Sequence, residues 1–212
     1  MSAGLEDVVA ADTILSDVDG LLGKLIIRGR SLDSLVPHTR VEDCIELLWD
    51  GFFDDFPKGA ELQRALGEAR VQIFHHTDAI DDELLDLQPI EAVRALIARI
   101  PDGDDLTAAL YMVAAPAVFT PAIMRAKRGR QMVSPDPSLP HSVDILRMAN
   151  VRMPEEYDVQ ALDSYLVSVS DHGLNASTFA ARVVASTQAG MTSSILAAIG
   201  ALKGPLHGGA PA

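Results

Sequence analysis

The stretch from Val183 to Leu202 contains no charged residue, and small residues make up most of it. Apolar residues recur at helical spacing on both sides of Gly190, a pattern that predicts two helices separated at that glycine. Serines and threonines dilute the hydrophobicity too much for a transmembrane span. A helix made of Ala, Gly, Ser and Thr on most faces allows other helices to approach it closely on several sides. The stretch therefore belongs in the core of a large helical protein or at a subunit interface.

A histidine lies at each end of this helical region. His172 occupies the short polar segment DHGLN just before the first helix, where Asn175 is a good N-cap. His207 follows the second helix, in the segment GPLHGG of residues 204–209. Proline cannot continue a helix and glycine relaxes the backbone, so this segment predicts a tight loop at a helix C-terminus. The loop presents one imidazole on a constrained backbone.

The order of these motifs resembles the citrate synthase family, in which a DHxxNAST-like segment, two small-residue helices and a GPLHGGA loop follow one another. The resemblance implies that His172, together with Asn175, binds the substrate oxaloacetate. It also implies that His207 is the acid that polarises the thioester carbonyl of an acyl-CoA and stabilises its enol. Ser177 is then the hydroxyl that orients the His207 ring. Gly173 departs from the family pattern, because a glutamate usually follows the first histidine.

The chemistry gives a physical reason for these residue types. Condensing an acyl-CoA with a keto acid needs a base that removes a weakly acidic proton, and a donor on the thioester oxygen as the enolate forms. A neutral imidazole can donate from one nitrogen while a neighbour fixes its tautomer through the other. The resemblance implies an acyltransferase that condenses acetyl-CoA with oxaloacetate to citrate and CoA, with propionyl-CoA and 2-methylcitrate as the alternative. Because the acyl-CoA is a substrate, no cofactor is expected.

The resemblance covers essentially the whole chain but only the first half or so of the family's length. In the family the remaining part supplies another oxaloacetate-binding histidine, the aspartate base and the arginines that pair with carboxylates. In this chain no residue is a convincing base, and Arg182 is a weak candidate for a carboxylate partner.

Three hypotheses about completeness stay open. The chain is a truncated citrate synthase-like enzyme, a half-length chain that works with a second chain carrying the other half, or a non-catalytic helical module for dimerisation or binding. Retention of His172, Asn175, Ser177 and His207 together favours the first two, because a scaffold would need the helices but not both imidazoles.

The expected fold class is all-α, a multi-helical citrate synthase-like large domain with a small N-terminal β-hairpin. Turn signals at Asp19-Gly20 and Gly23-Lys24 flank a short apolar run and predict the hairpin. From Ser31 onward the pattern is helical almost throughout. Residues 1–212 are expected to form a single helical domain, with the family's small domain absent.

Three helical features carry expectations of their own. The uncharged stretch Leu106–Met124 contains two prolines, which predicts a pair of buried helices. A further helix over Glu155–Ser170 is expected to bury Leu162, Tyr165, Leu166 and Val169. The one dense basic cluster is expected to be a solvated turn, and it consists of Arg125, Lys127, Arg128 and Arg130.

Charge and composition limit the partners. The formal net charge of -13 argues against nucleic acid, whose phosphates would be repelled. Two anionic substrates need local positive charge that overcomes this global field. The single cysteine, Cys44, cannot form an intrachain disulfide, and the acidic N-terminus shows no targeting signal, so a cytoplasmic location is expected. Neither a metal site nor a membrane span is expected. The resemblance implies a homodimer, because the matching helices of the family pack against a second subunit.

Overall fold

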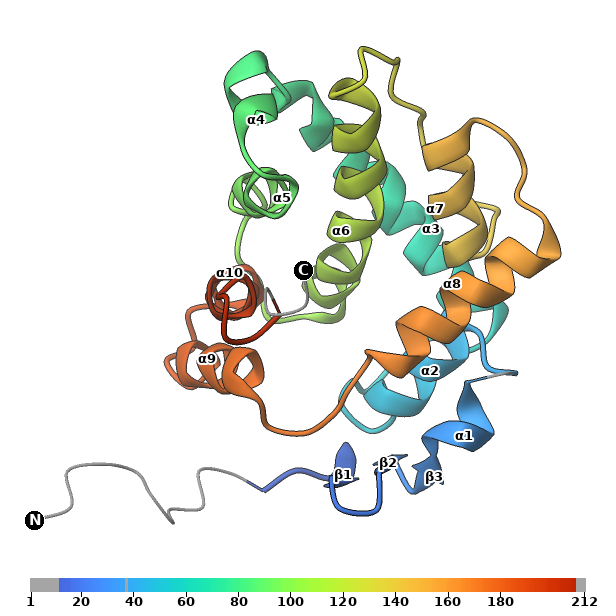
Figure 1. Ribbon diagram of the computed structural model, residues 1–212, viewed down its shortest axis with the longest axis vertical. Helices are drawn as coiled ribbons and strands as arrows, with labels where there is room; N and C mark the ends of the chain where they lie inside the picture. Colours follow the sequence, from blue (N-terminus) through green and yellow to red (C-terminus); the bar gives the residue numbers. More distant parts are fainter. Residues whose placement is uncertain (1–11, 37, 209–212) are drawn as a thin grey trace, which may run out of the picture.

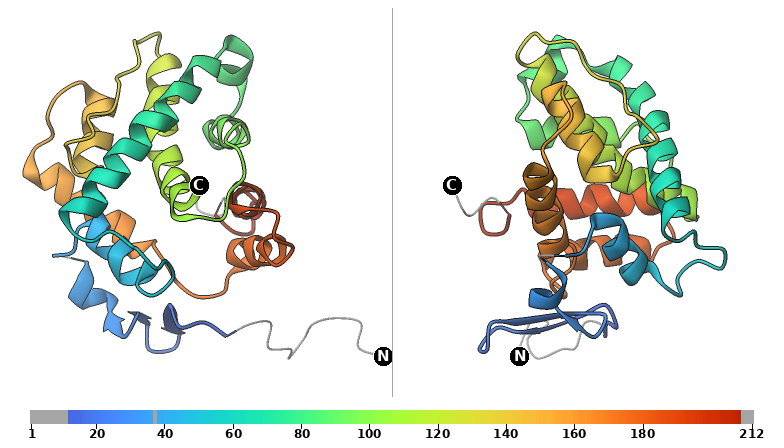
Figure 2. Two further views of the ribbon diagram at one scale, coloured as in Figure 1. Left: turned by 180° about the vertical axis from the view of Figure 1, so that it is seen from behind. Right: turned by 90° about the vertical axis from the view of Figure 1, so that its right-hand side faces the viewer.

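The computed structural model describes residues 12–36 and 38–208. This part of the chain is mostly helical with one small antiparallel sheet (Figure 1), which confirms the expected all-α fold with an N-terminal hairpin. The sheet lies at one end of the helical assembly (Figure 2). The strands are β1 Ser16–Asp19, β2 Lys24–Ile27 and β3 Arg30–Ser31, and the helices are α1 Leu32–Leu35, α2 Val41–Trp49, α3 Ala60–Phe74, the 3-10 helix η1 His75–Ala79, α4 Asp82–Asp86, α5 Pro89–Ile97, α6 Leu106–Ala126, α7 His141–Asn150, α8 Glu156–Ser168, α9 Ala176–Ala185 and α10 Met191–Leu202.

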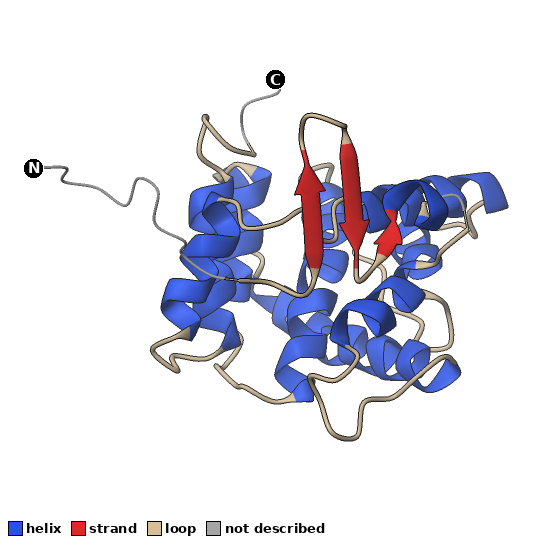
Figure 3. Cartoon of the chain, turned by 90° about the horizontal axis from the view of Figure 1, so that it is seen from below, coloured by secondary structure: helices blue, strands red, loops and turns tan. Residues whose placement is uncertain are grey.

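The N-terminal sheet has the strand order β1-β2-β3, and both pairs are antiparallel (Figure 3). The predicted hairpin is β1 with β2, and the short strand β3 extends it. The turn between β2 and β3 consists of Arg28 and Gly29, whose φ angles are +48° and +80°. Two-residue hairpin turns of this kind need positive φ at both positions, and glycine meets that need without strain.

Helix α6 is a single continuous helix, so the expected pair of helices over this stretch is wrong. Each proline inside a helix removes a ladder hydrogen bond and costs about 3 kcal/mol. Burial offsets this cost, because Val118, Phe119 and Ile123 lie in the core and α3, α5, α7 and α10 pack against α6. By length and composition α6 could cross a membrane, but 56% of its most apolar window is buried within the fold. That burial is typical of a core helix.

A buried ion pair joins α3 to α7. The Arg70 side chain is completely buried, with its Nε 2.9 Å from Oδ2 of Asp144 and its Nη1 3.0 Å from Nδ1 of His141. Burial lowers the pKa of Arg70, and the Asp144 carboxylate opposes that shift. Because arginine can only donate, Nδ1 of His141 must accept, and the ring is neutral. Gly67 allows α3 to lie close to the loop before α7, since an added Cβ at Gly67 would lie 2.2 Å from the Pro137 carbonyl oxygen.

His141 should make the stability of the protein depend on pH. Burial, assisted by the nearby Arg70 charge, lowers the pKa of His141 from 6.5 to about 3. Between these values the unfolded chain binds a proton that the folded protein does not, so the stabilisation is complete above pH 6.5 and is lost as the pH falls. From pH 7 to pH 5 this group should lower the free energy of unfolding by about 2 kcal/mol.

Urea unfolding at pH 7, 6 and 5 would measure this effect in the wild type and in His141→Asn. The asparagine amide oxygen can still accept a hydrogen bond from Arg70 but does not titrate. The variant should therefore lose less stability than the wild type over this interval. Equal losses in the two proteins would show that His141 is not the responsible group.

The basic cluster after α6 is not simply a solvated turn, and the expectation is wrong for Arg125. The Arg125 side chain is buried and donates hydrogen bonds to the carbonyl oxygens of Gln131 and Ala149, at 2.7 and 3.2 Å. These bonds attach the end of α6 to the following loop and to α7. Arg128 and Arg130 are exposed, as expected.

Candidate functional site

The two histidine segments meet because α9 and α10 pack against each other (Figure 1). His172 lies in the loop that precedes α9, and His207 lies in the turn that follows α10. The turn that joins the two helices ends at Gly190, the predicted break, which has a φ of +99°. An added Cβ at Gly190 would lie 2.4 Å from Oδ1 of Asp102, so the loop after α5 also requires glycine at this position.

Asn175 is the N-cap of α9, as predicted. Its Oδ1 accepts the backbone N–H of Thr178 at 2.9 Å and the hydroxyl of Ser177 at 2.7 Å. The backbone N–H of Thr178 fixes the orientation of the amide, so the NH₂ group faces His172 with Nδ2 3.2 Å from Nδ1 and 3.5 Å from Nε2 of the ring. An amide nitrogen only donates, so at the shorter of these two contacts Nδ1 of His172 accepts. The proton of the neutral ring is then on Nε2, where it is available to a ligand.

Ser177 links this arrangement to His207. Its Oγ lies 3.0 Å from Nε2 of His207 and 2.7 Å from Oδ1 of Asn175. The hydroxyl has one proton and two acceptors within reach. When that proton points to His207, the ring carries its own proton on Nδ1 and can donate from it while neutral. In that state the hydroxyl no longer donates to Asn175, whose Oδ1 still accepts the Thr178 N–H. The contact expected between Ser177 and His207 is present, and a series of polar contacts joins His172, Asn175, Ser177 and His207.

A cavity of about 680 Å³ lies beside these residues. His172, Asn175 and Ser177 line it, whereas His207 contacts the lining through Ser177. The cavity is also lined by Ile90, Tyr165, Val169, Ser170, Asp171, Thr178, Leu202, Lys203 and Gly208.

Two of these lining residues correct the expectation for α8. Tyr165 and Val169 are 62% and 48% exposed, so they are not buried in the core as the helical pattern predicted. Asp163 and Val167 are the buried residues of α8 instead. The apolar pattern therefore marks a largely exposed face that borders the cavity.

Lys203 is the cation that sequence analysis missed. It is the only lysine or arginine among the described residues that line the cavity, and its Nζ lies 2.6 Å from Oε1 of Glu91. The Lys203 ammonium lowers the pKa of the Glu91 carboxyl. A signal was available, because Lys203 is the first charged residue after the uncharged stretch and directly precedes GPLHGG. Arg182, the earlier candidate, is exposed, contacts the Asp12 carbonyl oxygen at 3.4 Å and does not line the cavity.

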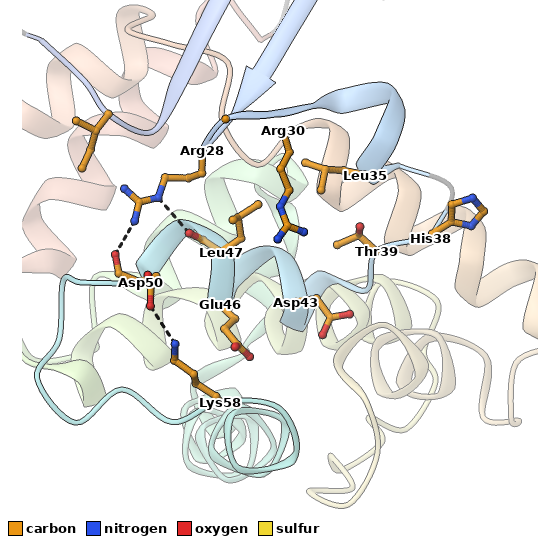
Figure 4. A pocket seen from close by; sticks show the side chains of 12 residues that line it. Arg28, Arg30, Leu35, His38, Thr39, Asp43, Glu46, Leu47, Asp50 and Lys58 are labelled. Atoms are coloured by element: carbon orange, nitrogen blue, oxygen red, sulfur yellow. Dashed lines mark hydrogen bonds and ion pairs between the residues drawn. The ribbon is translucent and has the colours of Figure 1, made fainter.

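A second cavity, of about 780 Å³, lies between the sheet and α2 and contains none of the four predicted site residues (Figure 4). Its charged groups are largely engaged in structural contacts. Arg28 donates to the carbonyl oxygens of Leu47 and Asp50 at 3.2 and 2.7 Å, and Lys58 pairs with the Asp50 carboxylate at 3.0 Å. Arg28 thereby satisfies carbonyl groups at the C-terminus of α2, where a positive charge is also favourable.

No cluster of three or more His, Cys, Asp or Glu side chains within residues 12–36 and 38–208 is arranged to hold a metal ion.

Comparison with known proteins identifies the family. The family model described as "Citrate synthase, C-terminal domain" matches residues 4–212. This chain belongs to the citrate synthase family. A citrate synthase of Haloferax volcanii is 35% identical in an alignment that is 235 residues long with its gaps and covers 100% of this chain and 60% of that protein. A 2-methylcitrate synthase of Mycobacterium tuberculosis is 36% identical in an alignment that is 220 residues long with its gaps and covers 98% of this chain and 55% of that protein.

Solved citrate synthases share the fold. The crystal structure of the Thermotoga maritima citrate synthase matches with a TM-score of 0.81 and 27% identity, covering 99% of this chain and 57% of that one. The Thermoplasma acidophilum citrate synthase, solved as a ternary complex with carboxymethyl coenzyme A and oxaloacetate, matches with a TM-score of 0.77 and 28% identity, covering 99% and 58%. The 212-residue chain thus spans somewhat more than half the length of these family members.

Proposed function

We propose that this chain carries the part of a citrate synthase-like acyltransferase site that binds oxaloacetate and polarises the thioester of acetyl-CoA. The observation that carries the proposal is the series of polar contacts from His172 through Asn175 and Ser177 to His207, beside the 680 Å³ cavity. In the complete reaction water hydrolyses the thioester formed by the condensation, which yields citrate and CoA, as in the tricarboxylic acid cycle. Propionyl-CoA is the second candidate acyl donor, because a 2-methylcitrate synthase is 36% identical to this chain.

Each residue has a distinct task in this proposal. The Nε2–H of His172 donates to the keto carbonyl of oxaloacetate, and Asn175 holds that tautomer from Nδ1. With the Ser177 hydroxyl donating to Nε2 of His207, the Nδ1–H of His207 donates to the thioester oxygen as negative charge develops there. Lys203, which is ion-paired with Glu91, is the cation at the cavity wall in a chain whose net charge is -13.

We assign the catalytic base and the arginine partners of the carboxylates to the part of the enzyme outside these 212 residues, on the same polypeptide or on a second one. The family members that match extend well beyond the aligned region, since this chain covers 55 to 60% of the two curated relatives described above. A base is needed to remove the proton next to the thioester. The isolated chain should therefore bind oxaloacetate and turn over slowly.

Two measurements test the function on the 212-residue chain. Calorimetry should detect oxaloacetate binding that His172→Gln weakens, and an assay of thiol release should require both oxaloacetate and an acyl-CoA. Comparing acetyl-CoA with propionyl-CoA in that assay identifies the preferred acyl group. A folded chain that binds neither oxaloacetate nor an acyl-CoA would contradict the proposal and favour a non-catalytic helical module.

A homodimer through α9 and α10 forms part of the proposal. Phe179 and Val183 of α9 are 39% and 50% exposed, so this helix presents apolar side chains outward. Apolar surface of this kind marks protein contacts. Sedimentation velocity should show a dimer in the wild type and a larger monomer fraction in Val183→Lys. A wild-type protein that sediments as a monomer at micromolar concentrations would disprove the dimer.

A further inference from the structure

The N-terminal sheet contacts the loop that presents His172, although the two are far apart in the sequence. The Oδ1 of Asp171 accepts a hydrogen bond from the hydroxyl of Ser16, the first residue of β1. The same oxygen accepts the backbone N–H of Gly173 at 3.0 Å. One carboxylate oxygen thus closes a tight turn around His172 and attaches that turn to the sheet.

A second contact between β1 and this loop involves Gly173. Its φ is +86°, and an added Cβ would lie 3.3 Å from Cγ2 of Val18. Positive φ strains residues with a side chain, so glycine allows the loop both to turn and to lie against the strand. The glycine that replaces the family's usual glutamate therefore has a local structural reason in this chain.

The sheet is itself firmly attached, so it can hold the loop in place. Ile27 of β2 is completely buried and packs in one cluster with Leu35, Cys44 and Val167. Arg28 binds the C-terminal end of α2. The sheet, α2 and α8 thus form one packed unit to which the loop is attached.

We propose that Asp171 is the positioning residue of His172. It positions the histidine by accepting hydrogen bonds, and its negative charge is not needed for this role. This inference rests on the proposed binding of oxaloacetate by His172. The Asp171 side chain lines the same cavity as His172. A carboxylate there repels a dianionic ligand, so its charge opposes binding while its acceptor bonds orient the histidine. Asparagine keeps the acceptor oxygen and removes the charge.

The direction in which substitutions at Asp171 and Ser16 change oxaloacetate affinity tests this inference. Asp171→Ala and Ser16→Ala should each weaken oxaloacetate binding roughly fivefold or more, because each removes a hydrogen bond that holds the loop. Asp171→Asn should bind oxaloacetate as tightly as the wild type or more tightly. Asp17→Ala is the matched control. Asp17 is an exposed residue of the same strand, but the hydrogen bond to Asp171 comes from its neighbour Ser16.

A second readout does not depend on substrate. Long-range ¹H–¹⁵N spectra of histidine-labelled protein, assigned with His172→Gln, report which ring nitrogen carries the proton. The wild type, Asp171→Asn and Asp17→Ala should show His172 as the Nε2–H tautomer. Asp171→Ala and Ser16→Ala should show a mixture of tautomers, with melting by circular dichroism confirming that each variant is folded.

The outcomes separate this inference from the proposed function. An unchanged His172 spectrum in Asp171→Ala, or an Asp171→Asn variant that loses affinity as Asp171→Ala does, would overturn the positioning role while oxaloacetate binding by the wild type upholds the function. Conversely, His172 spectra that change as expected in a protein that does not bind oxaloacetate would overturn the function and leave the positioning of the ring established.

Discussion

Asp144→Ala should lower the free energy of unfolding by about 3–5 kcal/mol, the cost of leaving a buried charge without its partner. Asp144 and Arg70 are both completely buried, and the distance between Oδ2 and Nε is 2.9 Å. Asp144 also accepts hydrogen bonds from Arg147 and from the backbone of Asp136, so the loop before α7 depends on the same carboxylate. The total stability of a domain is about 5–15 kcal/mol, so this loss is a large share of it.

Urea unfolding monitored by circular dichroism measures the effect. Asp50→Ala is the matched control, because Asp50 also forms an ion pair, with Lys58, but on the surface where solvent screens it. The control should unfold at nearly the wild-type urea concentration. A double variant, Arg70→Met with Asp144→Leu, should recover part of the lost stability, because no buried charge then remains unpaired while the hydrogen bonds to Asp136 and His141 stay lost. Similar midpoints for Asp144→Ala and Asp50→Ala would contradict the assignment of the buried pair.

His207→Ala should reduce thiol release by a factor of about 100–1,000, the usual effect of removing one donor to a developing oxyanion. Under the proposed function, the imidazole donates to the thioester oxygen as the enolate forms. Oxaloacetate affinity should stay within a factor of about two, because His172 and not His207 contacts that substrate in this proposal. The substitution should therefore lower turnover without weakening oxaloacetate binding.

Two further variants sharpen this prediction. Ser177→Ala removes the hydroxyl 3.0 Å from Nε2 of His207 and should lower thiol release less than His207→Ala does. Ser177→Thr keeps a hydroxyl and should restore part of the activity. Carboxymethyl coenzyme A, whose carboxylate places negative charge near the position of the enolate oxygen, should lose affinity in His207→Ala when oxaloacetate is present. Normal thiol release by His207→Ala would exclude this histidine as the donor.

The order of local motifs made much of the candidate site predictable. Asn175 has the side chain of an N-cap and precedes a helix, and GPLHGG cannot continue one, so both predicted helix ends are present among the described residues. Two helices joined by the short turn at Gly190 must run back along each other. The end of α10 therefore comes beside the start of α9, and His207 reaches Ser177.

Contacts between distant segments were not predictable in this way. Ser16 and Asp171 are 155 positions apart, and no local sequence pattern predicts that they are in contact. Tyr165 and Val169 follow helical spacing, but spacing cannot distinguish a core from the wall of a cavity. The prolines of α6 signal a break by local rules, and only the burial of that helix outweighs them.

By itself, then, the sequence determined the family, the helical class and the four residues that converge, because capping, turn formation and helical periodicity act over a few neighbouring residues. The tertiary structure decided the course of α6, the burial of Arg125, the ion pair of Arg70 with Asp144, and the place of Lys203 in the cavity wall. Those outcomes depend on which side-chain surfaces pack against one another and lose contact with water. That balance of burial and desolvation is set by the packing of the whole chain, and it cannot be read from any one segment.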